Sequence, residues 1–106
     1  MKGQDMTTNK MRAIHAGEIL REEFLAPLGI TPHALAISLR VPAPRINDIV
    51  REKRAISVDT AMRLARYFDT TAQFWMNLQS TYDLKIAEKT LSQRIVIEVP
   101  QLQRAA

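Results

Sequence analysis

The chain has 106 residues, of which 46% are hydrophobic and 25% are charged, and this is the size and balance of a single globular domain. It contains no cysteine, which excludes disulfide bonds and thiolate metal sites and agrees with a reducing compartment. No apolar run approaches the roughly 18–20 residues of a membrane span, and the N-terminal residues lack the apolar core of a signal peptide. We therefore expect a cytoplasmic domain, and its net charge of +4 favours a polyanionic partner.

The composition predicts an all-α fold, because glycine is scarce and the alternating pattern of a strand is nearly absent before residue 94. Residues 1–13 show no periodicity and are expected to be a flexible segment. Helical patterns fill residues 14–82, which we take as the main domain, and residues 83–106 form a C-terminal extension.

The first helix is predicted over residues 16–26. Pro27 and Gly29 end it, and Gly29 is expected to take the left-handed conformation of a C-cap. The side chains that this helix buries are expected to be Ile19, Leu20 and Phe24.

Two short helices with a tight break between them are predicted next. Thr31 is a good N-cap for the first, and Pro32 suits its first helical position. The second opens around residues 42–44, and only about three or four residues join the two, so they must cross steeply. This is a helix-turn-helix arrangement, whose second helix can lie in a DNA major groove. The two apolar faces consist of Leu35, Ala36 and Leu39, and of Ile46, Ile49 and Val50.

The outward face of the second helix follows from roughly 100° per residue. Burial of its apolar residues turns Pro44, Asp48 and Arg51 outward, with Arg45 and Asn47 beside them. Arginine and asparagine can each bond two atoms of one base edge, guanine for arginine and adenine for asparagine. Asp48 is expected to accept from a cytosine amino group or to orient one of the two arginines. The alternative is a small helical bundle with a charged surface.

Two further helices complete the main domain. Ser57 is expected to cap the fourth and Thr71 the fifth. Their apolar residues are Ala61, Leu64, Ala65 and Phe68, and Phe74, Trp75, Leu78 and Tyr82. Five helices with short loops predict a repressor-like helix-turn-helix domain of the lambda and 434 type, in which Trp75 and its aromatic neighbours belong to the core.

The C-terminal extension is ambiguous. Residues 83–91 favour helix, whereas residues 94–99 are rich in β-branched side chains and can form a short strand that pairs with another chain. The spacing by four of Leu91, Ile95 and Val99 equally predicts a helix that packs on the body of the domain.

Candidate DNA contacts combine the exposed face of the second helix with nearby loops and helix ends. Lys53, Arg54 and Thr31 are expected to bind phosphates and fix the register on the duplex. His33 is a further candidate, although it also fits a plain surface histidine. The full set is Thr31, His33, Ala43, Pro44, Arg45, Asn47, Asp48, Arg51, Lys53 and Arg54.

No catalytic or metal constellation is recognised in the sequence. His15 has no serine, cysteine or paired carboxylate at a suitable spacing, and His15 and His33 alone do not make a zinc site. We therefore expect a protein that is not an enzyme and that uses no cofactor.

Three stretches resemble the HigA/VapI family of antitoxins. Residues 15–25, His-Ala-Gly-Glu-Ile-Leu-Arg-Glu-Glu-Phe-Leu, resemble its opening, usually His-Pro-Gly-Glu-Ile-Leu, and residues 41–48, 53–56 and 59–65 match its middle. Residues 74–84, Phe-Trp-Met-Asn-Leu-Gln-Ser-Thr-Tyr-Asp-Leu, resemble the signature Phe-Trp-Leu-Asn-Leu-Gln followed by Tyr-Asp-Leu. The chain departs from the family pattern at Ala16, usually proline, and at Glu52, commonly glycine.

The resemblance implies a helix-turn-helix antitoxin of a bacterial type II toxin–antitoxin module. Such a protein is expected to be a homodimer that binds an inverted repeat in its own promoter and represses its operon. It is also expected to neutralise a HigB-type toxin, a small RelE-like ribonuclease that cuts mRNA on the ribosome. One alternative is a stand-alone transcriptional regulator. Another is a helical protein-interaction module, because Pro42 and Pro44 remove backbone donors that phosphates would use.

Overall fold

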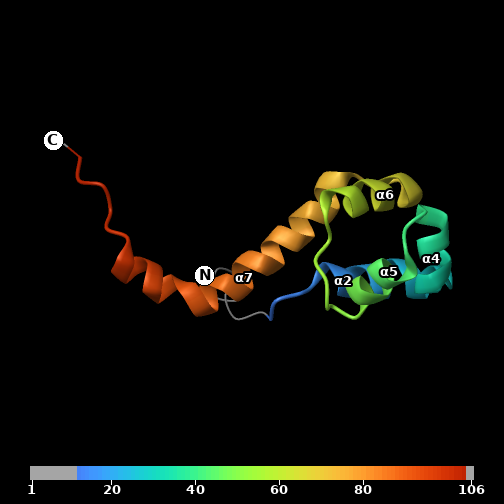
Figure 1. Cartoon of the computed structure of the whole chain (residues 1–106), viewed down its shortest axis with the longest axis horizontal. Coiled ribbons are helices and arrows are strands. Elements are labelled where there is room, and N and C mark those ends of the chain that lie inside the picture. Colours follow the sequence, from blue (N-terminus) through green and yellow to red (C-terminus); the bar gives the residue numbers. More distant parts are fainter. Residues whose placement is uncertain (1–11, 105–106) are drawn as a thin grey trace, which may run out of the picture.

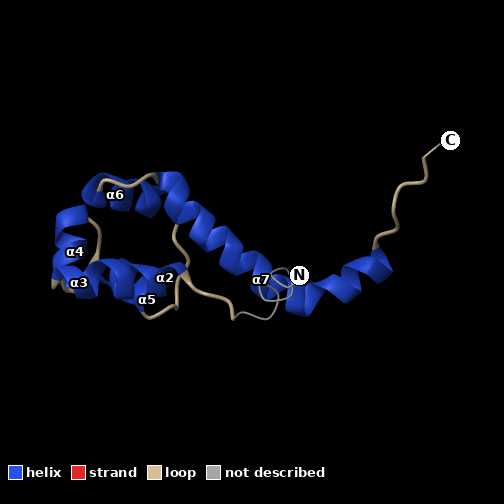
Figure 2. Ribbon diagram, turned by 180° about the vertical axis from the view of Figure 1, so that it is seen from behind, coloured by secondary structure: helices blue, strands red, loops and turns tan. Residues whose placement is uncertain are grey.

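The chain is described here by a computed structural model that covers residues 12–104, so the expectation of flexibility for residues 1–11 lies outside the described residues. Within that range the chain forms five helical units and no strand, and the all-α, repressor-like fold is confirmed (Figures 1 and 2). The units are α2 (Ala16–Ile19) continued by η1 (Leu20–Leu25) and α3 (Ala26–Leu28), then α4 (Pro32–Leu39), α5 (Ala43–Val50), α6 (Val58–Phe68) and α7 (Ala72–Glu98).

The first unit is one continuous helix with a widened turn in its middle. It begins at His15, whose Nδ1 accepts a hydrogen bond from the Gly17 amide at 2.8 Å. The turn widens over η1, just before Pro27, which has no N–H with which to continue an α-helical ladder. Gly29 ends the unit with φ +65°, as the sequence predicts.

The helix-turn-helix pair has the boundaries and the buried faces that the sequence predicts. The Thr31 hydroxyl caps α4 by accepting from the Ala34 amide at 3.0 Å, and Arg40 makes the turn with φ +60°. The predicted apolar residues of both helices are 6% exposed or less, namely Leu35, Ala36, Leu39, Ile46, Ile49 and Val50.

The core is completed by α6 and α7, which begin at the predicted caps, Ser57 and Thr71. Trp75 is fully buried, and its Nε1 donates to the Thr70 hydroxyl at 2.8 Å. Its ring lies 4.9 Å from that of Phe24, between centroids, so α7 is joined to the first unit by aromatic packing. The predicted role of Trp75 in the core is confirmed.

The C-terminal extension is helical over residues 83–91, as expected, and of the two alternatives for its later part it takes the helical one. α7 continues through residue 98, so residues 94–98 are helical and the short strand does not form. Figures 1 and 2 show the end of α7 projecting from the body, and every described residue from 88 onward is exposed. The expectation that Leu91, Ile95 and Val99 pack on the body is therefore wrong. A helix satisfies its own backbone, whereas a lone strand would leave N–H and C=O groups unpaired.

The first unit and α5 touch at Gly17. A Cβ built at this position would lie 1.7 Å from the Ile49 carbonyl oxygen, a distance that real Cβ atoms do not reach. One turn further on, an Nη1 of Arg21 donates to the Val50 carbonyl. The C-terminal end of α5 therefore rests directly on the backbone of α2.

We expect Gly17→Ala to lower the free energy of unfolding by about 1–3 kcal/mol, because the methyl group forces the two backbones apart. Alanine would otherwise favour the helix by about 1 kcal/mol, so the sign of the change is diagnostic. Urea unfolding measures the loss. Ala34→Gly, at an exposed position of α4, serves as the control and measures the difference in helix propensity between alanine and glycine. A Gly17→Ala protein as stable as the wild type would contradict the close approach.

The turn after α5 contains a strained backbone position. Glu52 has φ +63°, in the left-handed region that glycine occupies without strain, and this explains why the family commonly has glycine there. Its carboxylate accepts from Arg21 Nη2 at 3.2 Å, and both side chains are more than a third exposed. The departure from the family pattern therefore keeps the turn but adds strain and a negative charge.

Glu52→Gly should be more stable than Glu52→Ala by about 0.5–1 kcal/mol, since relief of roughly 1–2 kcal/mol of strain is partly offset by the freedom of glycine in the unfolded chain. Both variants lose the ion pair with Arg21, so their difference isolates the backbone. Thermal or urea unfolding measures it. Equal stabilities would show that residue 52 is not strained.

Candidate nucleic-acid interface

α5 presents a polar face beside its buried one. Pro44 and Arg51 are exposed, whereas Arg45, Asn47 and Asp48 are half-buried along the flanks. Ala43, in contrast, packs partly against the core, so little of its side chain is available to a ligand. The predicted outward direction is observed for Pro44 and Arg51, whereas Asp48, also predicted to point outward, is half-buried.

The N-terminus of α5 offers few free backbone donors. No side chain caps it, Pro44 has no N–H, and the Arg45 amide already donates to the Pro42 carbonyl at 3.0 Å. Contacts from this helix to a nucleic acid must therefore come mainly from side chains.

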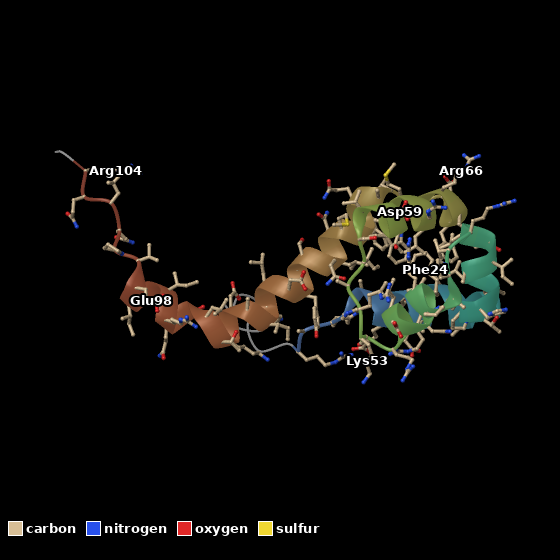
Figure 3. All side chains as sticks on the ribbon, viewed as in Figure 1. Phe24, Lys53, Asp59, Arg66, Glu98 and Arg104 are labelled. Atoms are coloured by element: carbon tan, nitrogen blue, oxygen red, sulfur yellow. The ribbon has the colours of Figure 1, made fainter. Side chains whose placement is uncertain are left out.

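Arg45 is held by α6. Its Nη1 donates to Asp59 Oδ2 at 2.7 Å, and Asp59 also accepts from Arg63 Nε at 3.0 Å. The hydrogen bond from Arg63, and then that from Arg45, hold the pKa of Asp59 below its ordinary value. Figure 3 labels Asp59 on α6, and no feature of the sequence predicted its contact with Arg45.

Asp48 has a different partner from those expected. It accepts from Arg54 Nη2 at 3.4 Å, and both side chains are more than a third exposed. Of the two roles that the sequence suggests, the orientation of Arg45 or Arg51 is not observed, and acceptance from a cytosine amino group stays a prediction. The loop after α5 turns back at Glu52, and this brings Arg54 beside α5.

Two cations of this surface are unpaired. Arg51 and Lys53 are exposed and make no side-chain hydrogen bond or ion pair with any residue between 12 and 104. Figure 3 shows Lys53 on the loop after α5, well away from Arg66 on α6. A polyanion would meet the charges of Arg51 and Lys53 without first displacing an internal partner.

Thr31 and His33 lie at the start of α4, and both are exposed. The Thr31 hydroxyl oxygen accepts from the Ala34 amide, so its proton remains available to an outside acceptor such as a phosphate oxygen. His33 has no partner among the described residues and is placed as a plain surface histidine would be.

Two polar side chains outside α5, Gln79 and His15, are buried and have structural roles. Gln79 on α7 is 5% exposed, and its Oε1 accepts from the Ile56 amide at 2.8 Å, which ties down the loop that carries Lys53. Its Nε2 donates to Asp83 Oδ1 at 3.0 Å, so both ends of this amide are bonded. His15 is 4% exposed, caps α2 and stacks edge-on with Tyr82 at 4.8 Å between ring centroids, which is a structural role.

The described residues hold no group of three or more metal-ligand side chains. None of the described helices, including the 27-residue α7, combines the length and hydropathy needed to cross a bilayer. What the surface offers is a rigid helix edge with arginine and asparagine side chains, flanked by unpaired cations. Such an edge can hydrogen-bond base edges while its flanks bind phosphates.

Comparisons with known proteins give a consistent result. Residues 20–75 match the helix-turn-helix family. Virulence-associated protein I of Dichelobacter nodosus is 58% identical over 92 residues, which cover 87% of this chain and 84% of that protein. The antitoxin HigA of Pseudomonas aeruginosa, solved with the higBA promoter, is 58% identical with a TM-score of 0.83, over 87% of this chain and all of that one (100%).

The antitoxin GraA, solved in complex with its operator, is 46% identical with a TM-score of 0.83, over 89% of this chain and 95% of that one. Identity at this level extends over nearly the whole length of these relatives, far beyond the helix-turn-helix pair. The resemblance found in the sequence is thereby confirmed, and the chain belongs to the HigA/VapI-type family of helix-turn-helix antitoxins.

Proposed function

We propose that this protein is a sequence-specific DNA-binding antitoxin that represses its own operon. The observation that carries the proposal is the geometry of α5, in which full burial of Ile46 and Ile49 fixes Arg45 and Asn47 on an accessible edge. The operator and promoter complexes of HigA and GraA, whose folds are similar, support the same use of the domain. A protein that binds an operator in bacterial DNA works in the cytoplasm.

The binding unit in this proposal is a homodimer on an inverted repeat. Each α5 would lie in a major groove, and the two half-sites would be about one helical turn apart, roughly 34 Å. The exposed apolar side chains at the end of α7 support an assembly of more than one chain, since water-exposed apolar surface of this extent usually marks an interface. They include Val96 and Ile97, which are 76% and 82% exposed.

The side chains divide into two roles. Arg45 and Asn47 would read base edges, since both lie on α5 and both can form bidentate contacts. Arg51, Lys53, Arg54 and the hydroxyl of Thr31 would bind phosphates, which gives affinity and register but little sequence information.

Arg45→Ala or Asn47→Ala should weaken binding to the DNA upstream of the gene by about 1–3 kcal/mol and relax selectivity at one base pair. Lys53→Ala is the control, because loss of a phosphate contact should weaken binding to all sequences alike and reduce the salt slope by about 1. Fluorescence anisotropy against a set of single-base-pair variants, repeated at several salt concentrations, measures both. If Arg45→Ala weakened every sequence equally, it would not read a base.

The second half of the proposed function is neutralisation of a HigB-type, RelE-like toxin that cuts mRNA. Membership of the antitoxin family supports it. The candidate toxin-binding surfaces are residues 1–14, the first helical unit and the chain after Tyr82.

We expect co-expression of this chain to restore growth to cells that produce the toxin encoded beside its gene. A truncation after residue 83 keeps Trp75 and Gln79, the buried residues of α7, so the domain should still fold. Rescue by this shorter chain would exclude the end of α7 as the toxin-binding surface. The absence of any small toxin-like reading frame beside the gene, together with intact DNA binding, would instead identify a stand-alone regulator.

A further inference from the structure

One carboxylate joins three helices of the domain. Asp59 on α6 accepts at Oδ2 from Arg45 of α5, at 2.7 Å, and from Arg63 of α6, at 3.0 Å. Arg63 in turn donates from Nη1 to the Leu39 carbonyl at the end of α4, at 2.8 Å. The guanidinium of Arg45 is thus tied, through two other side chains, to the backbone of the helix that precedes the turn.

This contact holds Arg45 without using up its donors. A guanidinium has five N–H groups, and the bond to Asp59 is the side chain's single hydrogen bond among residues 12–104. The side chain is 30% exposed, so part of it faces solvent while the rest lies against the protein. Its position is largely fixed before any ligand arrives, which reduces the entropy that binding would otherwise cost.

The same carboxylate disfavours one kind of ligand. A DNA phosphate placed on Arg45 would come close to the negative charge of Asp59, and like charges at short range repel. The pKa of Asp59 is held below its ordinary value by Arg63 and Arg45, so the carboxylate is ionised at neutral pH. A base edge carries no net charge and does not meet this repulsion. Guanine O6 and N7 are acceptors that suit the remaining donors of Arg45.

We propose that Asp59 is a positioning residue that directs Arg45 to a base edge and away from the phosphate backbone. This inference rests on the proposed DNA-binding function and assigns part of its sequence specificity to α6, outside the helix-turn-helix pair. Arg63 has the supporting role, because it fixes the carboxylate of Asp59 relative to α4.

The test compares wild type, Asp59→Asn and Glu23→Gln in the full chain. Glu23→Gln makes the same charge change at an exposed position of η1, outside the candidate DNA contacts, and serves as the matched control. Anisotropy is measured with two duplexes, one carrying the DNA immediately upstream of the gene and one of equal length and random sequence. Asp59→Asn should weaken binding to the upstream duplex by about 5- to 150-fold, the value of one good base contact, and leave binding to the random duplex equal or tighter.

A scan of single-base-pair variants of the upstream duplex tests whether Asp59 acts through Arg45. Asp59→Asn and Arg45→Ala should lose discrimination at the same base pair, and the double variant should lose no more than Arg45→Ala alone. Asp59→Glu, which keeps the carboxylate, should recover most of the specificity. Asp59 is more than half exposed, at 55%, so the domain should still fold without its charge, and thermal unfolding checks this.

Two results would overturn the inference. One is an Asp59→Asn protein that shows no loss of preference for the upstream duplex. It would bind that duplex as tightly as the wild type, or bind both duplexes more tightly with an unchanged ratio, and in the second case Asp59 would only compete with DNA for Arg45. The other is a double variant whose losses add, which would place the action of Asp59 elsewhere. A wild-type chain without preference for the upstream duplex overturns the proposed function itself, and this inference with it.

Discussion

The position of α5 depends on a backbone-to-backbone contact at Gly17. α5 has eight residues, and a helix of that length has little stability on its own in water. Its place is therefore set by what it packs on, and at its C-terminal end that is the glycine of α2, whose missing side chain lets the Ile49 carbonyl approach. Arg21, from the same unit, satisfies the neighbouring Val50 carbonyl. Any larger residue at position 17 would move the helix whose edge carries the candidate base-reading side chains.

Polar contacts fix the other two sides of the candidate interface. Asp59 and Arg63 hold the N-terminal half of α5 to α6 and α4, and the buried amide of Gln79 holds the loop that leaves it. Both contacts come from helices that follow α5 in the sequence, namely α6 and α7. The domain thus presents a rigid edge rather than a flexible cationic segment, and rigidity is what a side chain needs to discriminate between base pairs, since an unfixed arginine can bind any acceptor within reach.

The sequence predicted those features that depend on neighbours a few residues away. The caps at Thr31, Ser57 and Thr71 and the buried faces of the two helix-turn-helix helices are local, because side-chain identity and spacing determine them. The partners of Asp48 and Gln79 were not predicted, since they depend on how a turn folds back or on how α7 crosses the loop. Asp59 was missed for the same reason: its spacing to Arg63 is visible along one helix, but its contact with Arg45 exists only after three helices have packed.

The conformation at the end of α7 also depends on more than the local sequence. Its β-branched run fits a strand, and its spacing by four fits a helix, so local preferences do not decide between them. Helix forms there because it continues the hydrogen-bond ladder of the preceding turns, which a lone strand would have to break. No part of the described body covers its apolar side chains, and Ile97 remains 82% exposed. Apolar side chains left outside a folded domain are typical of a surface that contacts another chain.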